Sequence, residues 1–289
     1  MGATLIYGLI NSAVLALMAL GFNLTFGISG VANFAYGAIY IVAGFITWSL
    51  INALHIPFIF SAVITVIAVG IAGVYLYRII LTRIRGLVIS EVIATFAVSL
   101  VILELLRYFG FIGFKYSLPP FIKGSVEIMD AFVDAQRLII IGFGIVVLFA
   151  LYVFTHYTRM GRAFRGIAQE EHTSLSLGIN PDRIAGWSMG IGSALGALAA
   201  IVILPLGTIT VDGGYDVLIS ALSVCIVGGL GSTFGVIIAS LIIGFAQQLT
   251  ATYLSSHWTM IVSLVALLII LAIKPSGLLG HQKELEERV

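Results

Sequence analysis

Charge is scarce in this sequence, and its scarcity excludes whole classes of protein. Lysine, arginine, aspartate and glutamate make up only 9% of the 289 residues, whereas hydrophobic residues make up 60%. Soluble globular domains carry about 25% charged residues, so the chain is no ordinary soluble domain. The net charge is +1, and no basic stripe with interleaved aromatic residues occurs, which excludes nucleic-acid binding. The single cysteine, Cys225, can form neither an internal disulfide nor a CxxC site.

Motifs for nucleotide and metal chemistry are missing as well. The chain has no GxxxxGK[ST] loop, so we expect that it does not hydrolyse ATP by itself. It has no HExxH motif, and Glu170, Glu171 and His172 lack a second histidine at ligand spacing. The apolar segments are nearly free of ionisable groups, with Glu91 and Glu104 in the fourth, whereas ion-driven transporters usually carry such groups as relays. We therefore expect no catalytic and no metal-binding residue, and an energy source outside the chain.

Long hydrophobic runs, in contrast, fill most of the sequence. A membrane-spanning helix needs roughly 20 apolar residues. Segments of suitable length cover residues 4–26, 30–52, 57–78, 87–109, 138–157, 185–206, 233–254 and 258–274, with a shorter candidate at 217–230. We predict an all-α, polytopic transmembrane bundle of eight or nine spans, forming a single membrane domain over residues 1–289. Residues 217–230 and the glycine-rich region 27–37 either cross fully or form broken helices.

The uneven distribution of lysine and arginine predicts the orientation. One set of basic residues belongs to loop 78–87, to loop 158–184 and to the C-terminal end with Lys274, Lys283 and Arg288. The others, Arg107, Lys115, Lys123 and Arg137, flank a loop that also holds acidic residues. We predict that the first set and the tail 275–289 are cytoplasmic and that loop 110–137 is periplasmic. Nine spans place the N-terminus outside and eight place it inside; the lack of basic residues before Arg78 argues against a cleaved signal peptide.

The loop at 158–184 concentrates charge between apolar segments. As a helix it brings Phe164, Ile167, Ala168 and Leu175 onto one face and Arg162, Arg165, Gln169 and His172 largely onto others. This amphipathic pattern is typical of a docking surface for a partner protein. The alternative is a solvated connector between two membrane helices.

Polar and small residues share one face of the second apolar segment. Asn33, Gly37, Tyr40 and Gly44 follow helical spacing, so they would line a pathway or admit another helix. The glycines at 27 and 30, with Asn23 and Thr25, favour a helix break just before this segment. A helix starting there would offer free N–H groups to an anionic part of a substrate.

Small residues four apart recur in the later segments and favour close helix packing. Residues 180–182 (NPD) predict a helix start, through an asparagine cap, a first-turn proline and an acidic residue. The run at 228–232 (GGLGS) interrupts the late apolar region. We expect packing or hinge roles for Gly190, Gly196, Gly228, Gly229, Gly231 and Gly235.

Several motifs, in order along the chain, resemble those of the H-type permease subunit of high-affinity branched-chain amino acid ABC importers. The wider group includes urea, amide and monosaccharide permeases. The matching motifs are VANFAYG at 31–37, similar to the N-F-A-H-G segment of the family; RMGRA at 159–163 with LGIN at 177–180; VGGLGS at 227–232; and KPSGLLG at 274–280. The resemblance extends from about Leu5 to Gly280 and implies the ABC importer permease fold, with broken helices and a cytoplasmic coupling helix.

The resemblance also implies partners. The chain would be a multi-pass permease of the cell inner membrane, surrounded by lipid and working beside a second homologous permease, two cytoplasmic ABC ATPases and a periplasmic substrate-binding protein. It would bind no cofactor, because ATP and Mg²⁺ are used by the ATPases. The helix around 161–177 would insert into an ATPase groove, with Phe164 and Ile167 as apolar anchors. The implied coupling residues are Gly161, Arg162, Ala163, Phe164, Ile167, Ala168, Glu171, Leu175 and Gly178.

The expected pathway residues are Asn33, Phe34, Tyr36, Gly37, Tyr40, Thr95 and Ser99. The sequence has Tyr36-Gly37-Ala38 where the family commonly has His-Gly-Glu, and it lacks a lysine often found near Ser220. An apolar pathway suits branched-chain or other hydrophobic amino acids; aromatic acids, urea and amides stay open as substrates. Two other classes also stay open, an ATP-independent transporter or channel and a structural membrane subunit.

Overall fold

The computed structural model describes residues 2–30, 32–111, 113, 116–122, 124–128, 131–169 and 171–280. Expectations about Val31, Lys115, Lys123, Glu170 and the tail beyond residue 280 lie outside these residues. The helices are α1 (Gly2–Ser29), α2 (Tyr36–Asn52), α3 (Phe58–Leu76), α4 (Thr82–Ile84), α5 (Val88–Tyr108), α6 (Ala135–Tyr157), α7 (Arg159–Gln169), α8 (Glu171–Ser176), α9 (Pro181–Ile203), α10 (Gly213–Gly228), α11 (Thr233–Tyr253) and α12 (Thr259–Ile273). A π-helical turn, Tyr77–Leu81, joins α3 to α4.

The fold is an all-α polytopic bundle, as predicted. Within the described part of the chain, six helices are long and apolar enough to cross a membrane, and α2, α10 and α12 are shorter apolar helices. Helices α1 and α9 form the centre, because α1 packs against α9, α10 and α11 while α9 also contacts α2 and α3. The interior face of α9 is rich in alanine, glycine and serine, which lets neighbouring backbones approach closely. Helices α3, α5 and α6 lie farther out and expose apolar side chains along their lengths.

The connection from α1 to α2 differs from its prediction. Asn23 and the following residues through Ser29 belong to α1, and the break comes at Gly30, whose φ of 68° lies in the left-handed region. The Oδ1 atom of Asn33 then accepts a hydrogen bond from the Ala35 N–H at 3.1 Å, which holds the turn before α2. Helix α2 therefore begins at Tyr36 and not at residue 30. Its 17 residues rise about 26 Å, less than the roughly 30 Å of a bilayer core, so α2 alone is too short to cross that core.

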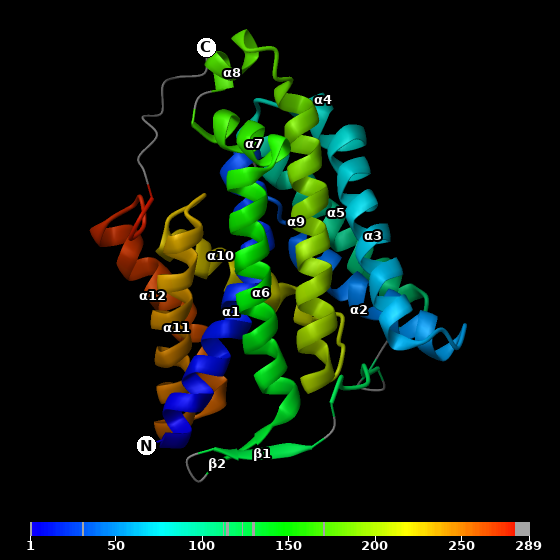
Figure 1. Cartoon of the computed structure of the whole chain (residues 1–289), viewed down its shortest axis with the longest axis vertical. Helices are drawn as coiled ribbons and strands as arrows, with labels where there is room; N and C mark the ends of the chain where they lie inside the picture. The colour runs from blue at the N-terminus through cyan, green and yellow to red at the C-terminus, as the bar shows by residue number, and fades with distance from the viewer. Residues whose placement is uncertain are drawn as a thin grey trace.

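A small hairpin interrupts the predicted loop 110–137. Strands β1 (Ser125–Ile128) and β2 (Ala131–Asp134) pair antiparallel, with Val126 opposite Val133. The sequence had predicted no strand there, because β1 and β2 are only four residues each. Figure 1 shows the hairpin and the N-terminus at one end of the bundle and α4, α7 and α8 at the other. The two predicted cytoplasmic loops that carry arginine, 78–87 and 158–184, thus lie at the same end, which we call the basic end.

Candidate functional site

The predicted docking loop folds into two helices, α7 and α8, on either side of residue 170. The Thr158 hydroxyl caps α7 by accepting a hydrogen bond from the Gly161 N–H at 2.9 Å. At the far end Gly178 has a φ of 79°, and the Ile179 N–H donates to the Ser174 carbonyl at 3.0 Å. This glycine-ended turn terminates α8 and redirects the chain toward α9.

The apolar face of α7 is covered by the chain itself. Phe164 is 1% exposed and Ile167 is 3% exposed, and the ring of Phe164 meets that of Phe154 on α6 edge to face at 5.6 Å. A Cβ at Gly161 would lie 2.6 Å from the Thr155 Cα, so only glycine allows α7 to lie this close to the end of α6. The prediction that Phe164 and Ile167 project into a partner groove is therefore wrong for this conformation, because both side chains are buried against their own subunit.

A different set of side chains faces outward from this segment. Arg159, Arg162 and Arg165 are exposed on α7, while Ala163 and Ala168 are half-buried. In and after α8, Leu175 is 51% and Leu177 is 75% exposed. The side chain of Glu171 lies outside the described set. The arginines and the two leucines together give the segment a basic surface with an exposed apolar edge, which we call the α7–α8 surface.

Most of the predicted pathway residues are buried in the helix core. Tyr36 is 0% and Tyr40 1% exposed, and Asn33 is buried as well. Gly37 lies so close to Gly214 at the start of α10 that a Cβ would overlap the Gly214 carbonyl. The polar face predicted for α2 thus exists, but it packs against other helices of this chain. Of the two predicted roles, this conformation shows the face admitting another helix; pathway lining stays a prediction, and it would require α2 and α10 to separate.

Thr95 and Ser99 lie on the one buried stripe of α5. Glu91, Thr95, Ser99 and Leu103, four residues apart, are buried along this helix. The Thr95 hydroxyl accepts a hydrogen bond from the Phe34 N–H at 3.2 Å, and the half-buried Phe34 ring packs edge to face on Phe96. Thr95 and Phe34 therefore attach α5 to the turn before α2.

The glycines with predicted packing roles lie where helices approach each other. Gly190 on α9 faces Val74 and the Gly70 carbonyl of α3, and Gly196 faces the ring of Tyr36. Gly231 lies against Gly27 of α1. Gly228 and Gly235 lie against each other, and Gly229, with a φ of 101°, lies against Gly280. The GGLGS turn is thus packed on both sides, with its backbone in a conformation that glycine favours.

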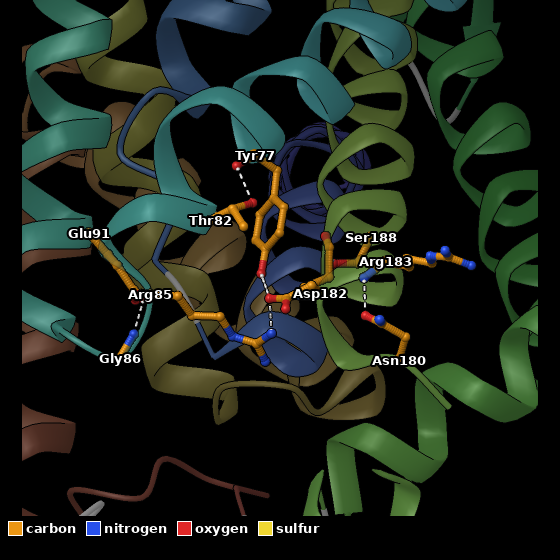
Figure 2. A network of polar contacts seen from close by, with 10 residues as sticks. Tyr77, Thr82, Arg85, Gly86, Glu91, Asn180, Asp182, Arg183 and Ser188 are labelled. Atoms are coloured by element: carbon orange, nitrogen blue, oxygen red, sulfur yellow. Dashed lines mark hydrogen bonds and ion pairs between the residues drawn. The ribbon is translucent and has the colours of Figure 1, made fainter. Parts of the chain in front are cut away.

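Sequence reasoning missed a polar network at the basic end, shown in Figure 2. Asp182, in the first turn of α9, forms an ion pair with Arg85 and accepts a hydrogen bond from the Tyr77 hydroxyl at 3.5 Å. Close by, the buried Glu91 accepts a hydrogen bond from the Gly86 N–H at 2.9 Å. From the sequence, Asp182 was identified only as part of a helix start, and Arg85 only as one of the basic residues that predict membrane orientation. Their proximity could not be predicted, because it depends on how α3, α5 and α9 pack.

Comparisons with known proteins agree with the fold and the motifs. Residues 4–271 match the model of the family described as branched-chain amino acid transport system / permease component. The high-affinity branched-chain amino acid transport system permease protein LivH of Salmonella typhimurium is 30% identical over 292 residues, which cover 95% of this chain and 94% of the relative. The permease protein LivM of the same-named system in that organism is 27% identical over 139 residues, covering 47% of this chain and 32% of LivM.

One solved structure is also similar. PsaBC from Streptococcus pneumoniae, in complex with Fab, superposes with a TM-score of 0.52 at 15% identity, covering 94% of this chain and 92% of that one. At this identity the likeness shows a shared fold alone. The family match, which spans nearly the whole chain, shows that this protein belongs to the branched-chain amino acid transport system permease family.

Proposed function

We propose that the chain is the membrane-spanning permease subunit of an ATP-driven ABC importer for branched-chain or other hydrophobic amino acids. It works by alternating access in the inner membrane, with the basic end in the cytoplasm. The observation that carries the proposal is the α7–α8 surface. It is a separately capped helical segment outside the bundle, packed through Gly161 onto α6, with arginines and two leucines facing outward.

One of the two cytoplasmic ATPases is the partner of the α7–α8 surface. Leu175 and Leu177 replace Phe164 and Ile167 as the apolar groups that enter an ATPase groove, because only the former are exposed. The row of arginines favours a groove with an acidic rim, since opposite charge steers association. ATP and Mg²⁺ are bound by these ATPases.

A second, homologous permease and a periplasmic binding protein complete the assembly. The partial likeness to LivM supports a related partner, because LivH and LivM are permease proteins of one named system. The substrate class follows from the names of the relatives. The sequence around Tyr36 adds little to it, because Tyr36 is buried among helices of this chain.

The deciding experiment is uptake into proteoliposomes. The complete assembly, with ATPases and binding protein, is loaded with ATP and supplied with labelled leucine, phenylalanine and urea. ATP-dependent uptake of leucine by the complete assembly, and none by the permeases alone, is the expected result. Uptake by this chain without ATP would overturn the mechanism, and ATP-dependent uptake of urea alone would overturn the substrate class.

A further inference from the structure

The α7–α8 segment is joined to the bundle through the first turn of α9. After Gly178 the Asn180 side chain caps α9, with its Oδ1 accepting a hydrogen bond from the Arg183 N–H at 3.1 Å. Pro181 and Asp182 then form the first turn. The Asn180 cap and the preset backbone of Pro181 fix this helix start. Only a short connection therefore separates the α7–α8 segment from Asp182.

Asp182 is the point where three parts of the chain meet. Arg85 reaches it from the loop between α4 and α5, and the Tyr77 hydroxyl reaches it from the π-helical turn after α3 (Figure 2). The π-helical turn widens the end of α3 by one residue, a distortion often found at functional positions. We call Asp182, Arg85 and Tyr77 the Asp182 joint.

On one side, the Asp182 joint is fixed to α5. Gly86 follows Arg85 with a φ of 91°, and its N–H donates to the buried Glu91 carboxylate in the first turn of α5. Arg85 is therefore tied to the start of α5 through its own backbone. Only one stripe of α5 is fully buried, flanked by the partly buried Val98, Ile102 and Leu106, so α5 has less packing to break than the central helices when it shifts.

On the other side, the Asp182 joint is fixed to α3 and α9. Tyr77 is 2% exposed and packs with Leu81, Ala185 and Met189 in a small apolar cluster distinct from the main core. A Cβ at Gly186 would lie 3.3 Å from the Tyr77 ring, so the first turns of α9 follow the end of α3 closely. The end of α3 and the start of α9 thus form one unit, and Arg85 connects that unit to α5.

We propose that the Asp182 joint transmits movement of the α7–α8 segment to α5, which makes Asp182 and Arg85 positioning residues for transport. The inference rests on the proposed function, in which ATPases move that segment. A partly exposed ion pair of this kind contributes little to stability. Its expected role is therefore to set which helices move together, and its loss should uncouple ATP hydrolysis from transport while the bundle stays folded.

The test is a double-mutant cycle in the complete assembly. Arg85→Gln and Asp182→Asn remove one charge each, and Arg85→Gln/Asp182→Asn removes both. For each we would measure leucine uptake, ATP hydrolysis and the thermal midpoint of the purified assembly. We expect each single variant to lower uptake per ATP by about tenfold, a coupling typical of contacting residues, and the double variant to lower it no further. Tyr77→Phe, which keeps the packed ring, should lower the same ratio by a smaller factor.

Arg83→Gln is the matched control, because Arg83 is exposed on the same short connection but has no place in the Asp182 joint. It should leave uptake per ATP unchanged. If the single variants lower uptake and hydrolysis in proportion, or if their effects add in the double variant, the Asp182 joint does not transmit movement. If the wild-type assembly shows no ATP-dependent uptake at all, the proposed function fails, and this inference fails with it.

Discussion

Single residues decide how closely the helices of this permease approach. Gly37 and Gly214 bring α2 and α10 almost into backbone contact, and Gly21 and Gly192 do the same between α1 and α9. Lipid is as apolar as leucine, so helix association in a membrane depends on such close packing more than on the hydrophobic effect. In the sequence, Gly37 was assigned to a pathway, because a small residue on a polar helix face fits pathway lining and close helix packing equally well.

Gly37→Ala should destabilise the protein strongly. The added methyl group would overlap the Gly214 carbonyl, so α2 and α10 must separate, at a cost of about 1–3 kcal/mol in unfolding free energy. Thermal unfolding of the purified protein in detergent measures the effect. Gly142→Ala on α6 is the control, because nothing lies within 4 Å of its added Cβ. An equal loss in the two variants would contradict the packing argument.

Thr95→Val should cost stability through an unpaired backbone group. The valine has the same shape but cannot accept the hydrogen bond from the Phe34 N–H, and leaving this partly buried donor unpaired costs about 1 kcal/mol. Thr95→Ser keeps the hydroxyl and should lose much less. Denaturation of both variants in the same detergent tests this, and equal stability of the valine variant and the wild type would show that the hydrogen bond is dispensable.

At the scale of elements, α7 illustrates what a helical pattern can and cannot indicate. Its amphipathic spacing was apparent in the sequence, and the segment is helical. The apolar face, however, lies against Phe154 and the end of α6, which leaves the arginine face exposed. Periodicity identifies an apolar face, but it cannot say whether a partner or the same chain covers it.

The two faces of this segment should respond differently to substitution. Leu177→Glu should leave the bundle folded and reduce recovery of the ATPases by about tenfold or more, because it removes an apolar anchor from the contact. Phe164→Glu buries a charge and should destabilise the chain by about 3 kcal/mol or more. Co-purification, combined with a thermal midpoint for each variant, separates the two effects. A folded Phe164→Glu protein that has lost the ATPases would restore Phe164 as the docking residue.

At the scale of the whole molecule, the positions of the loops make the orientation testable. Both arginine-rich loops lie at one end and the β1–β2 hairpin at the other (Figure 1). In a Cys225→Ala background, a cysteine at Leu177 should react with a membrane-impermeant maleimide only after the cell is opened. A cysteine at Val126, which is 46% exposed in β1, should react in cells with a permeable outer membrane. The reverse labelling pattern would show that the predicted membrane orientation is wrong.

Composition, apolar segment lengths and loop charges were enough to predict a polytopic helical bundle, because a bilayer requires about 20 apolar residues per span and closed backbone hydrogen bonding. Motifs with fixed spacing were enough to predict the family. These properties depend on residues close together in the sequence, so they can be recognised without knowing how the helices pack. Helix ends were predicted less closely: α2 begins six residues later than expected, since the turn at Gly30 and Asn33 sets its start.

Contacts between distant segments could not be derived in this way. The burial of Tyr36, the covering of Phe164 and the meeting of Tyr77, Arg85 and Asp182 each require several helices to be placed relative to one another. In a membrane protein nearly every face is apolar, so hydrophobicity does not distinguish a lipid-facing surface from a packed one. Only the packing of the folded helices assigns each face to lipid, partner or core.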